Sequence, residues 1–284
     1  MNKQLLAISG LMVLLSGCSQ LNMVKESIPF FSSEENQGVP LNAEEKVESK
    51  DNSINESTND QAAENIQQNE LVLASEFFNQ VKEVNGKNII QNPTNVLALV
   101  NKQYNLPSSY SPLDLVRPDV SFSFGDEKLE KSYLRQEASD ALEKMFNKAA
   151  QQDIHLVAVS GYRSYDRQAV LFDAEVNKVG KKKAVQVVAI PGSSEHQSGL
   201  AIDISSHSAN LILTEEFGKT VEGKWLAKHA HKYGYILRYP KGKETITGYQ
   251  YEPWHFRYVG VEAAKVIYKN KWTLEEYLNI VEKI

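Results

Sequence analysis

The sequence predicts an α+β fold, in which a small, mostly antiparallel sheet is flanked by helices. Segments with helical and with strand periodicity do not alternate regularly along the chain, which argues against a doubly wound parallel sheet. Residues 235–239 and 250–258 are strand-like segments on either side of a Pro-Lys-Gly turn, so we expect them to pair antiparallel. The 284-residue sequence shows no repeat of fixed period, and we expect one globular domain after the N-terminal segments.

Residues 1–17 are predicted to be a signal peptide. Their apolar stretch, residues 5–15, is 11 residues long and follows Lys3. A membrane-spanning helix needs roughly 20 residues, so this pattern is typical of a secretory signal instead. Residues 15–18 read Leu-Ser-Gly-Cys and resemble the bacterial lipobox, whose Cys becomes lipid-modified. We expect lipid on Cys18 to anchor the protein at the outer face of the cytoplasmic membrane, facing the cell wall; the alternative is an ordinary signal with an incidental Cys.

Residues 18–70 are predicted to be a disordered acidic tether. From Ser19 to Glu70 there are 11 acidic residues against three lysines, a net charge of −8. Low hydrophobicity with excess charge is typical of disorder, and a tether of this length reaches about 40 Å. Residues 71–284 carry a net charge of only +2. We therefore expect no nucleic-acid partner, and we expect this domain to be a monomer.

Helices and strands of residues 71–284 are predicted from apolar spacing. The clearest helix covers residues 134–149, and Ser164 is a suitable N-cap for the next one. Thr273 with Glu276 three residues later forms a capping box at the start of the last helix. The predicted helices are 71–84 and 95–104 in an N-terminal extension, 134–149, 165–179, 225–232 and two that close the chain. The predicted strands are 154–159, 201–205, 235–239 and 250–258.

Two histidines and one aspartate are the candidate metal ligands. His196 lies in a polar loop bounded by glycines, and Asp203 follows in a short strand between two isoleucines. A carboxylate in apolar surroundings needs a cationic partner, which is either an arginine or a metal. His255 follows Glu252 by three residues, around a proline that interrupts a flat strand. A chain with one Cys has no multi-thiolate zinc site, whereas two His and one Asp suit a catalytic Zn²⁺ with an open fourth position.

Three segments resemble the signature segments of a known enzyme family in order and spacing. They read Ser-Gly-Tyr-Arg-Ser at 160–164, Ser-Glu-His-Gln-Ser-Gly-Leu-Ala-Ile-Asp at 194–203 and Glu-Pro-Trp-His-Phe-Arg-Tyr at 252–258. The family is that of the VanY-type D-alanyl-D-alanine carboxypeptidases and their LdcB-like LD-carboxypeptidase relatives, and the resemblance covers roughly residues 95–270. It implies the zinc-peptidase fold shared with VanX and the Hedgehog signalling domain.

The resemblance also implies a role for each matched residue. Zn²⁺ would be held by His196, Asp203 and His255, with Glu252 as the catalytic base. Arg163 matches the arginine that contacts substrate. LdcB-like members add a glutamine and a serine, which are present here as Gln168 and Ser194.

The implied activity is removal of C-terminal D-alanine from peptidoglycan stem peptides. A carboxypeptidase must bind a terminal carboxylate, which the planar guanidinium of Arg163 suits, with Gln168 and Ser194 beside it. The alternative for Arg163 is a salt bridge to Asp203. Two other functions stay open at this point: an endopeptidase of the same fold, and a non-catalytic cell-wall-binding lipoprotein whose metal is closed off by a fourth protein ligand. The sequence leaves tetrapeptide and pentapeptide substrates equally open.

Overall fold

The computed structural model describes residues 72–284. The predicted signal peptide, the lipidation of Cys18 and the acidic tether lie outside these residues and stay predictions. No helix within 72–284 is long and apolar enough to cross a membrane.

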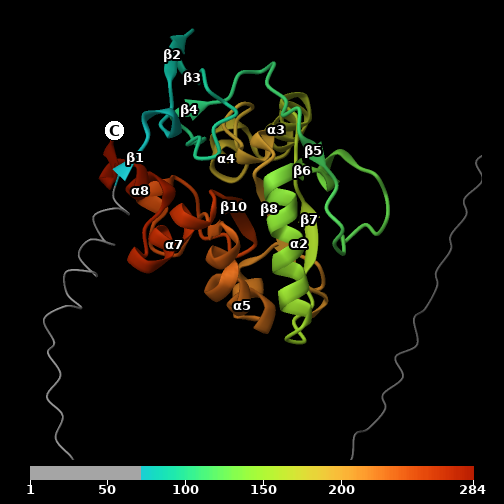
Figure 1. Cartoon of the computed structure of the whole chain (residues 1–284). Helices are drawn as coiled ribbons and strands as arrows, with labels where there is room; N and C mark the ends of the chain where they lie inside the picture. The colour runs from blue at the N-terminus through green and yellow to red at the C-terminus, as the bar shows by residue number, and fades with distance from the viewer. Residues whose placement is uncertain (1–71) are drawn as a thin grey trace, which may run out of the picture. The chain divides into compact units, whose positions relative to one another are not determined.

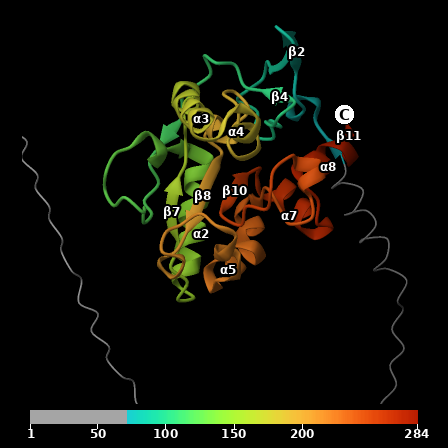
Figure 2. The ribbon, with the colours of Figure 1, turned by 180° about the vertical axis from the view of Figure 1, so that it is seen from behind.

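A four-stranded antiparallel sheet forms the centre of the domain, in the order β7-β8-β10-β9 (Figures 1 and 2). Its strands are β7 (Val157–Ser160), β8 (Ala201–Ser205), β10 (His255–Tyr258) and β9 (Tyr235–Leu237). The predicted α+β class with a small antiparallel sheet is confirmed. The predicted antiparallel pairing of the last two strands is also confirmed, although the chain from residue 238 to residue 254 joins them through a long loop rather than a tight turn.

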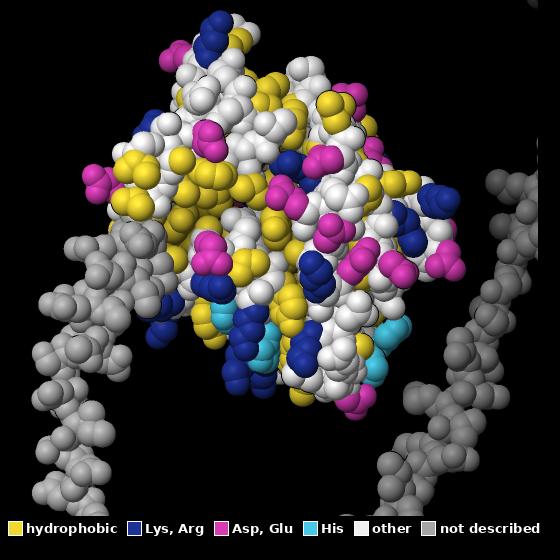
Figure 3. Space-filling view, in the orientation of Figure 1, with side chains coloured by type: hydrophobic (Ala, Val, Ile, Leu, Met, Phe, Trp, Pro, Cys, Tyr) yellow, Lys and Arg dark blue, Asp and Glu magenta, His cyan; other side chains and the backbone are white. Residues whose placement is uncertain are grey.

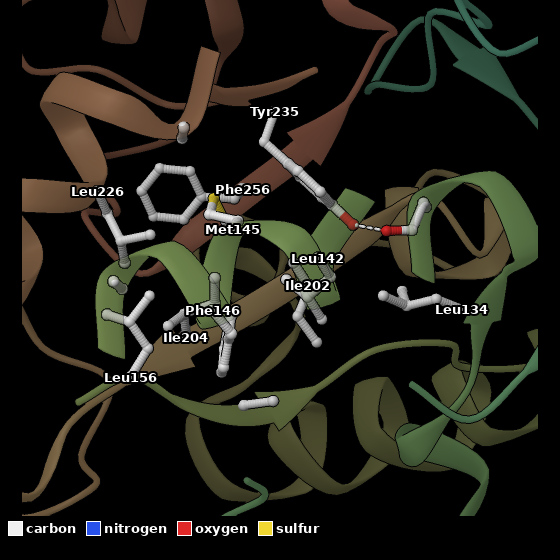
Figure 4. Close-up of a cluster of buried hydrophobic side chains, with 14 of the residues drawn as sticks. Leu134, Leu142, Met145, Phe146, Leu156, Ile202, Ile204, Leu226, Tyr235 and Phe256 are labelled. Carbon is white, nitrogen blue, oxygen red and sulfur yellow. Dashed lines mark hydrogen bonds between the residues drawn. The ribbon is translucent and has the colours of Figure 1, made fainter. Parts of the chain in front are cut away.

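Helix α2 (Gln136–Ala150) covers one face of this sheet. Its buried residues Leu142, Met145 and Phe146 pack with Ile202 and Ile204 of β8 in one apolar cluster (Figure 4). In the same close-up, the hydroxyl of a β9 tyrosine at position 235 donates a 2.6 Å hydrogen bond to a carbonyl of α2. The helical spacing therefore predicted both this helix and the face that it buries.

The remaining helices surround the sheet. α3 (Tyr165–Val179) begins after Ser164, whose hydroxyl accepts from the Arg167 backbone N–H, as predicted. α8 (Leu274–Ile280) begins with the predicted capping box of Thr273 and Glu276. The other α-helices are α4 (Lys181–Val187), α5 (Val221–His229), α6 (Glu244–Thr247) and α7 (Val261–Asn270). The 3₁₀ helices are η1 (Ser75–Phe77), η2 (Glu130–Ser132), η3 (Glu195–Ser198), η4 (His207–Ala209), η5 (Glu215–Lys219) and η6 (Ala230–Tyr233).

The N-terminal extension is not helical as predicted, and residues 71–84 and 95–104 are the two wrong helix predictions. Strands β2 (Val81–Val84) and β3 (Lys87–Ile90) form a hairpin, and β4 (Tyr104–Asn105) adds to β3. The hairpin turns at Asn85-Gly86, both with positive φ, which is the sequence pair that two-residue turns favour. Asparagine side chains replace helical hydrogen bonds in the second segment, where Asn101 accepts from the backbone N–H of residues 103 and 104.

Short strand pairs complete the domain. β1 (Val72–Leu73) pairs with β11 (Glu282–Lys283), so the two ends of the described chain lie side by side. β5 (Leu115–Val116) pairs with β6 (Leu134–Arg135) just before α2. On the face in Figure 3, Lys and Arg side chains gather over α5, and acidic and basic side chains are interspersed elsewhere.

Candidate metal centre and active site

The side chains of His196, Asp203 and His255 form one cluster. All three are buried, and one donor atom from each lies within 4.8 Å of the others. They come from η3, β8 and β10, and the β8–β10 register places Asp203 directly opposite His255. The structure thus brings together the three predicted metal ligands. Within residues 72–284 the cluster has three members, so no fourth protein ligand closes it as a purely structural metal would require.

In each histidine, the ring nitrogen that points away from the cluster has a hydrogen-bond partner, and the other ring nitrogen faces Asp203. His196 donates from Nδ1 to the Gly161 carbonyl at 2.7 Å, and its Nε2 lies 3.4 Å from Asp203. His255 has Nε2 at 3.3 Å from a carboxylate oxygen of Glu195 and Nδ1 at 3.1 Å from Asp203. Metal-binding histidines are oriented in this way by partners of their second nitrogen. The donor set and the orientation of both rings therefore fit Zn²⁺.

The surroundings of this cluster favour a positive charge. Burial acts to lower the pKa of His255, but its hydrogen bonds with Asp203 and Glu195 outweigh burial and raise that pKa to about 9. Burial acts to raise the pKa of Asp203, yet the two histidines hold it well below its usual range. A divalent cation in this position would meet an ionised carboxylate and displace a proton from the imidazole.

Glu252 lies beside the cluster with a different electrostatic state. Its carboxylate is 3.9 Å from His255 Nδ1, and its side chain is 24% exposed. Burial, opposed by His255 and reinforced by the charge of Asp203, raises the pKa of Glu252 to about 7. A carboxylate with a pKa near the working pH is suited to accept and return a proton. The position and the pKa of Glu252 suit the role of catalytic base that the sequence predicts for it.

Arg163 is held at the cleft by hydrogen bonds to uncharged side chains. Its guanidinium donates to Gln168 Oε1 at 2.9 Å and to the Ser160 hydroxyl at 3.3 Å. Within residues 72–284 the structure has no salt bridge between Arg163 and Asp203, so that alternative is wrong. Burial lowers the pKa of Arg163. The partly buried guanidinium retains capacity for an anionic ligand.

Gln168 and Ser194 both lie at this cleft, in unlike settings. Both ends of the Gln168 amide are hydrogen-bonded, because its nitrogen donates to the Ala189 carbonyl at 2.7 Å while its oxygen accepts from Arg163. Gln168 therefore orients the guanidinium. Ser194 is buried directly before η3 and lines the cleft beside His196.

A glycine lets the chain carry Arg163 to this position. Gly161 follows β7 and donates to the Lys131 carbonyl, and a Cβ at Gly161 would meet the Tyr133 carbonyl oxygen at 2.5 Å. Only glycine permits this close approach of two backbone segments. The carbonyl of Gly161 accepts the hydrogen bond that orients His196. One turn of the chain therefore positions both a metal ligand and Arg163.

The cleft has a volume of about 490 Å³ and is lined by all seven residues predicted to bind metal, bind substrate or act in catalysis. Its walls include Tyr239, Tyr249 and Trp254, which sequence reasoning did not single out. The Tyr239 ring lies 4.9 Å from the His255 ring, centroid to centroid, and packs against Tyr249. These aromatic walls shield the metal cluster from one side.

Glu195 is the main functional residue that the sequence analysis missed. Its side chain is fully buried and contacts Arg238, Arg257 and His255. Burial acts to raise the pKa of Glu195, but the two arginines hold it well below its usual range. The signal for the arginines was available, because both lie next to apolar strand residues, as Asp203 does.

Comparison with known proteins agrees with this site. The family model described as VanY, D-alanyl-D-alanine carboxypeptidase, matches residues 131–261. The protein named "Putative carboxypeptidase YodJ" of Bacillus subtilis strain 168 is 58% identical over 227 residues, which are 80% of this chain and 83% of that protein. This chain belongs to the VanY family. The resemblance read from the three motifs is therefore confirmed.

Two solved structures of VanY-type enzymes extend the comparison. The LdcB LD-carboxypeptidase has a TM-score of 0.74 and 59% identity, over 75% of this chain and all of that chain. A variant of the vancomycin-resistance D,D-pentapeptidase VanY in complex with Zn(II) has a TM-score of 0.53 and 35% identity, over 65% of this chain and 99% of that one. The predicted zinc-peptidase fold and zinc cofactor are confirmed, and this VanY family member is a zinc metallo-carboxypeptidase.

The first prediction concerns zinc content. His255→Ala removes one of three ligands, and the two that remain give too little affinity at neutral pH, so we expect the purified variant to lose most of its zinc by elemental analysis. His207→Ala, which changes an exposed histidine outside the cluster, is the matched control and should keep full zinc. Full occupancy in His255→Ala would show that the ligand set is wrong.

Proposed function

We propose that this carboxypeptidase removes the C-terminal D-alanine of peptidoglycan stem peptides, with the tetrapeptide as its preferred substrate. One observation carries the proposal. A three-donor metal cluster, a glutamate with a raised pKa and a partly buried arginine that forms no salt bridge within residues 72–284 line the same cleft. Such a cleft can hold a peptide by its terminal carboxylate and hydrolyse the last amide bond.

Zinc and Glu252 have separate tasks in the reaction. Zinc, when bound, polarises the scissile carbonyl and makes the attacking water more acidic. Glu252 takes a proton from that water and later delivers it to the nitrogen of the departing D-alanine. Its raised pKa suits both steps, because the carboxylate is ionised for the first and readily protonated for the second.

Arg163 makes the enzyme cut at a chain end. A guanidinium binds a carboxylate with two parallel hydrogen bonds, and Gln168 fixes the plane of this guanidinium. The terminal carboxylate bound by Arg163 then places the preceding amide bond toward the metal cluster and Glu252, which line the same cleft. An endopeptidase has no use for such a receptor.

The tetrapeptide preference is supported by the degree of similarity. This chain is 59% identical to the LdcB LD-carboxypeptidase and 35% identical to the D,D-pentapeptidase VanY. The bond cut in a tetrapeptide joins the L-centre of the third residue to the terminal D-alanine.

The second prediction tests this preference with defined tripeptide, tetrapeptide and pentapeptide stems and a mass-spectrometric readout. We expect one D-alanine to be lost from the tetrapeptide faster than from the pentapeptide, with the tripeptide left intact. Because each substrate must place a terminal carboxylate at the same arginine, the rates compare only the residue on the other side of the scissile bond. Cleavage of the pentapeptide alone would instead assign a DD-carboxypeptidase.

The third prediction separates Glu252 from the metal ligands. Glu252→Gln keeps the shape of the side chain but removes the base, so we expect kcat to fall about 10²- to 10⁴-fold while zinc content stays unchanged. Glu262→Gln, which alters an exposed glutamate on α7, is the control for loss of one negative charge. A near-wild-type rate in Glu252→Gln would mean that the base lies elsewhere.

The fourth prediction concerns the terminal carboxylate. Amidation of the substrate's C-terminus removes a charge-assisted contact to a partly buried guanidinium, so we expect kcat/KM to fall on the order of a thousandfold. Arg163→Lys should show a smaller difference between the free acid and the amide, because an ammonium cannot form the planar pair. Equal rates for acid and amide with the wild-type enzyme would favour the endopeptidase.

We also propose that lipid on Cys18 anchors the protein at the outer face of the cytoplasmic membrane. The support is the Leu-Ser-Gly-Cys sequence after a short apolar stretch. The acidic segment up to Glu70 would then let the carboxypeptidase domain search the cell wall above the membrane, as a monomer.

The fifth prediction tests this anchor by metabolic labelling of cells with a fatty-acid probe. Wild-type protein should carry the label and sediment with membranes, because acyl chains partition into the bilayer. Cys18→Ala should be unlabelled and appear in the soluble secreted fraction. An unlabelled, soluble wild-type protein would identify an ordinary secretory signal.

A further inference from the structure

A buried carboxylate contacts the outer side of a metal ligand. The Glu195 side chain is 0% exposed, and its Oε2 lies 3.3 Å from His255 Nε2. Its other oxygen, Oε1, accepts hydrogen bonds from two arginines, so Glu195 acts as an acceptor here and the imidazole N–H donates to Oε2. With its proton held on Nε2, His255 presents the Nδ1 lone pair to the metal cluster.

Two buried arginines hold Glu195 in place. Oε1 accepts from Arg238 Nε at 2.7 Å and from Arg257 Nη1 at 2.8 Å, and both arginines are 0% exposed. Arg257 uses its Nη2 for the carbonyls of Val96 and Ala98. Its remaining contact ties it to the main chain, since Nε donates to the Tyr258 carbonyl.

The second arginine connects this group to the C-terminal helix. Arg238 donates from Nη1 and Nη2 to the two carboxylate oxygens of Glu275, at 2.8 and 2.6 Å. Glu275 lies in the first turn of α8 and its side chain is 14% exposed. Two glutamates thus neutralise two arginines, and a continuous chain of contacts runs from α8 to His255.

We propose that Glu195 is a positioning residue that sets the orientation and tautomer of His255 for zinc, and that Glu275 supports it through Arg238. This inference rests on the proposed function only in taking His255 as a zinc ligand. It adds that zinc affinity depends on a charge on α8, which touches neither the metal cluster nor the substrate cleft.

A purely structural role would give a different result. If Glu195 served only to neutralise the two arginines, its loss would lower the stability of the metal-free protein but leave the affinity of the folded protein for zinc unchanged. A positioning role makes the affinity itself fall, because Nε2 loses its acceptor and the imidazole is free to turn or to change tautomer. Loss of such an outer partner costs about 10- to 100-fold in metal affinity.

Adjacent glutamates on α8 provide a matched pair of variants. Glu276 follows Glu275, and its carboxylate binds Lys243 at 2.7 and 2.9 Å instead of Arg238. Both lie in the first turn of the same helix and line the same second cleft, of about 690 Å³. Glu275→Gln and Glu276→Gln therefore remove the same charge from the same helix turn, and only the first reaches the chain of contacts to His255.

The experiment measures the zinc dissociation constant of the full-length protein by competition with a chromogenic chelator. Urea unfolding of the metal-free protein and the visible spectrum of the Co²⁺-substituted protein accompany it. We expect Glu195→Gln to weaken zinc binding about 10- to 100-fold and to change the Co²⁺ spectrum. Glu275→Gln should weaken zinc binding about 2- to 30-fold, because it acts through Arg238. Glu276→Gln should bind zinc as the wild type does.

The outcomes separate this inference from the proposed function. Wild-type zinc affinity in folded Glu195→Gln, or equal affinities in Glu275→Gln and Glu276→Gln, would overturn it while leaving the carboxypeptidase intact. If Glu195→Gln does not fold, the α8 pair decides alone. A wild-type protein that binds no zinc would instead remove the proposed function.

Discussion

The pairing of β8 with β10 is the constraint on which the active site depends. In this register Asp203 lies opposite His255, so two metal donors that are 52 residues apart in sequence lie side by side on adjacent strands. The register is fixed by packing: Ile202 and Ile204 join the apolar cluster under α2, whereas Asp203 between them has contacts with both histidines. A slip by one residue would exchange the two faces, exposing the isoleucines and burying the carboxylate against α2. Hydrophobic burial on one face of the sheet therefore sets the metal site on the other.

Local signals allowed much of the fold to be predicted. The bounds of α3 match the prediction because a serine cap marks its start, and the bounds of β8 match the prediction as well. The N-terminal extension failed because the apolar spacing of residues 71–84 was read as helical, although Asn85-Gly86 favours a hairpin turn. In that segment side-chain and backbone hydrogen bonds of asparagines decide the conformation, and a search for periodicity does not detect them.

The metal ligands could be predicted from the sequence, but the buried contacts of Glu195 with two arginines behind them could not. The three ligands lie in segments with recognisable order and spacing, whereas Glu195 finds its arginines 43 and 62 residues away. A charged residue among apolar strand neighbours indicates that it needs a partner, but not which one. Arg163 shows the same limit: the sequence allowed a pair with Asp203, and the fold directs the guanidinium to Gln168 and Ser160 instead. Tertiary packing makes that choice.

Two glutamates contact the same imidazole and have opposite electrostatic states. Glu195 lies 3.3 Å from Nε2 of His255, and two arginines keep it ionised. Glu252 lies 3.9 Å from Nδ1, and burial outweighs the opposing charges of His255 and Arg163 and raises the pKa of Glu252 to about 7. Exchanging the two environments would impair both tasks, because a carboxylate fixed as an anion does not readily return a proton, and a neutral carboxyl group accepts the imidazole N–H more weakly than a carboxylate does. The environment, rather than the residue type, therefore assigns one glutamate to orientation and the other to proton transfer. Arg238 and Arg257 make this division possible, since both form ion pairs with Glu195.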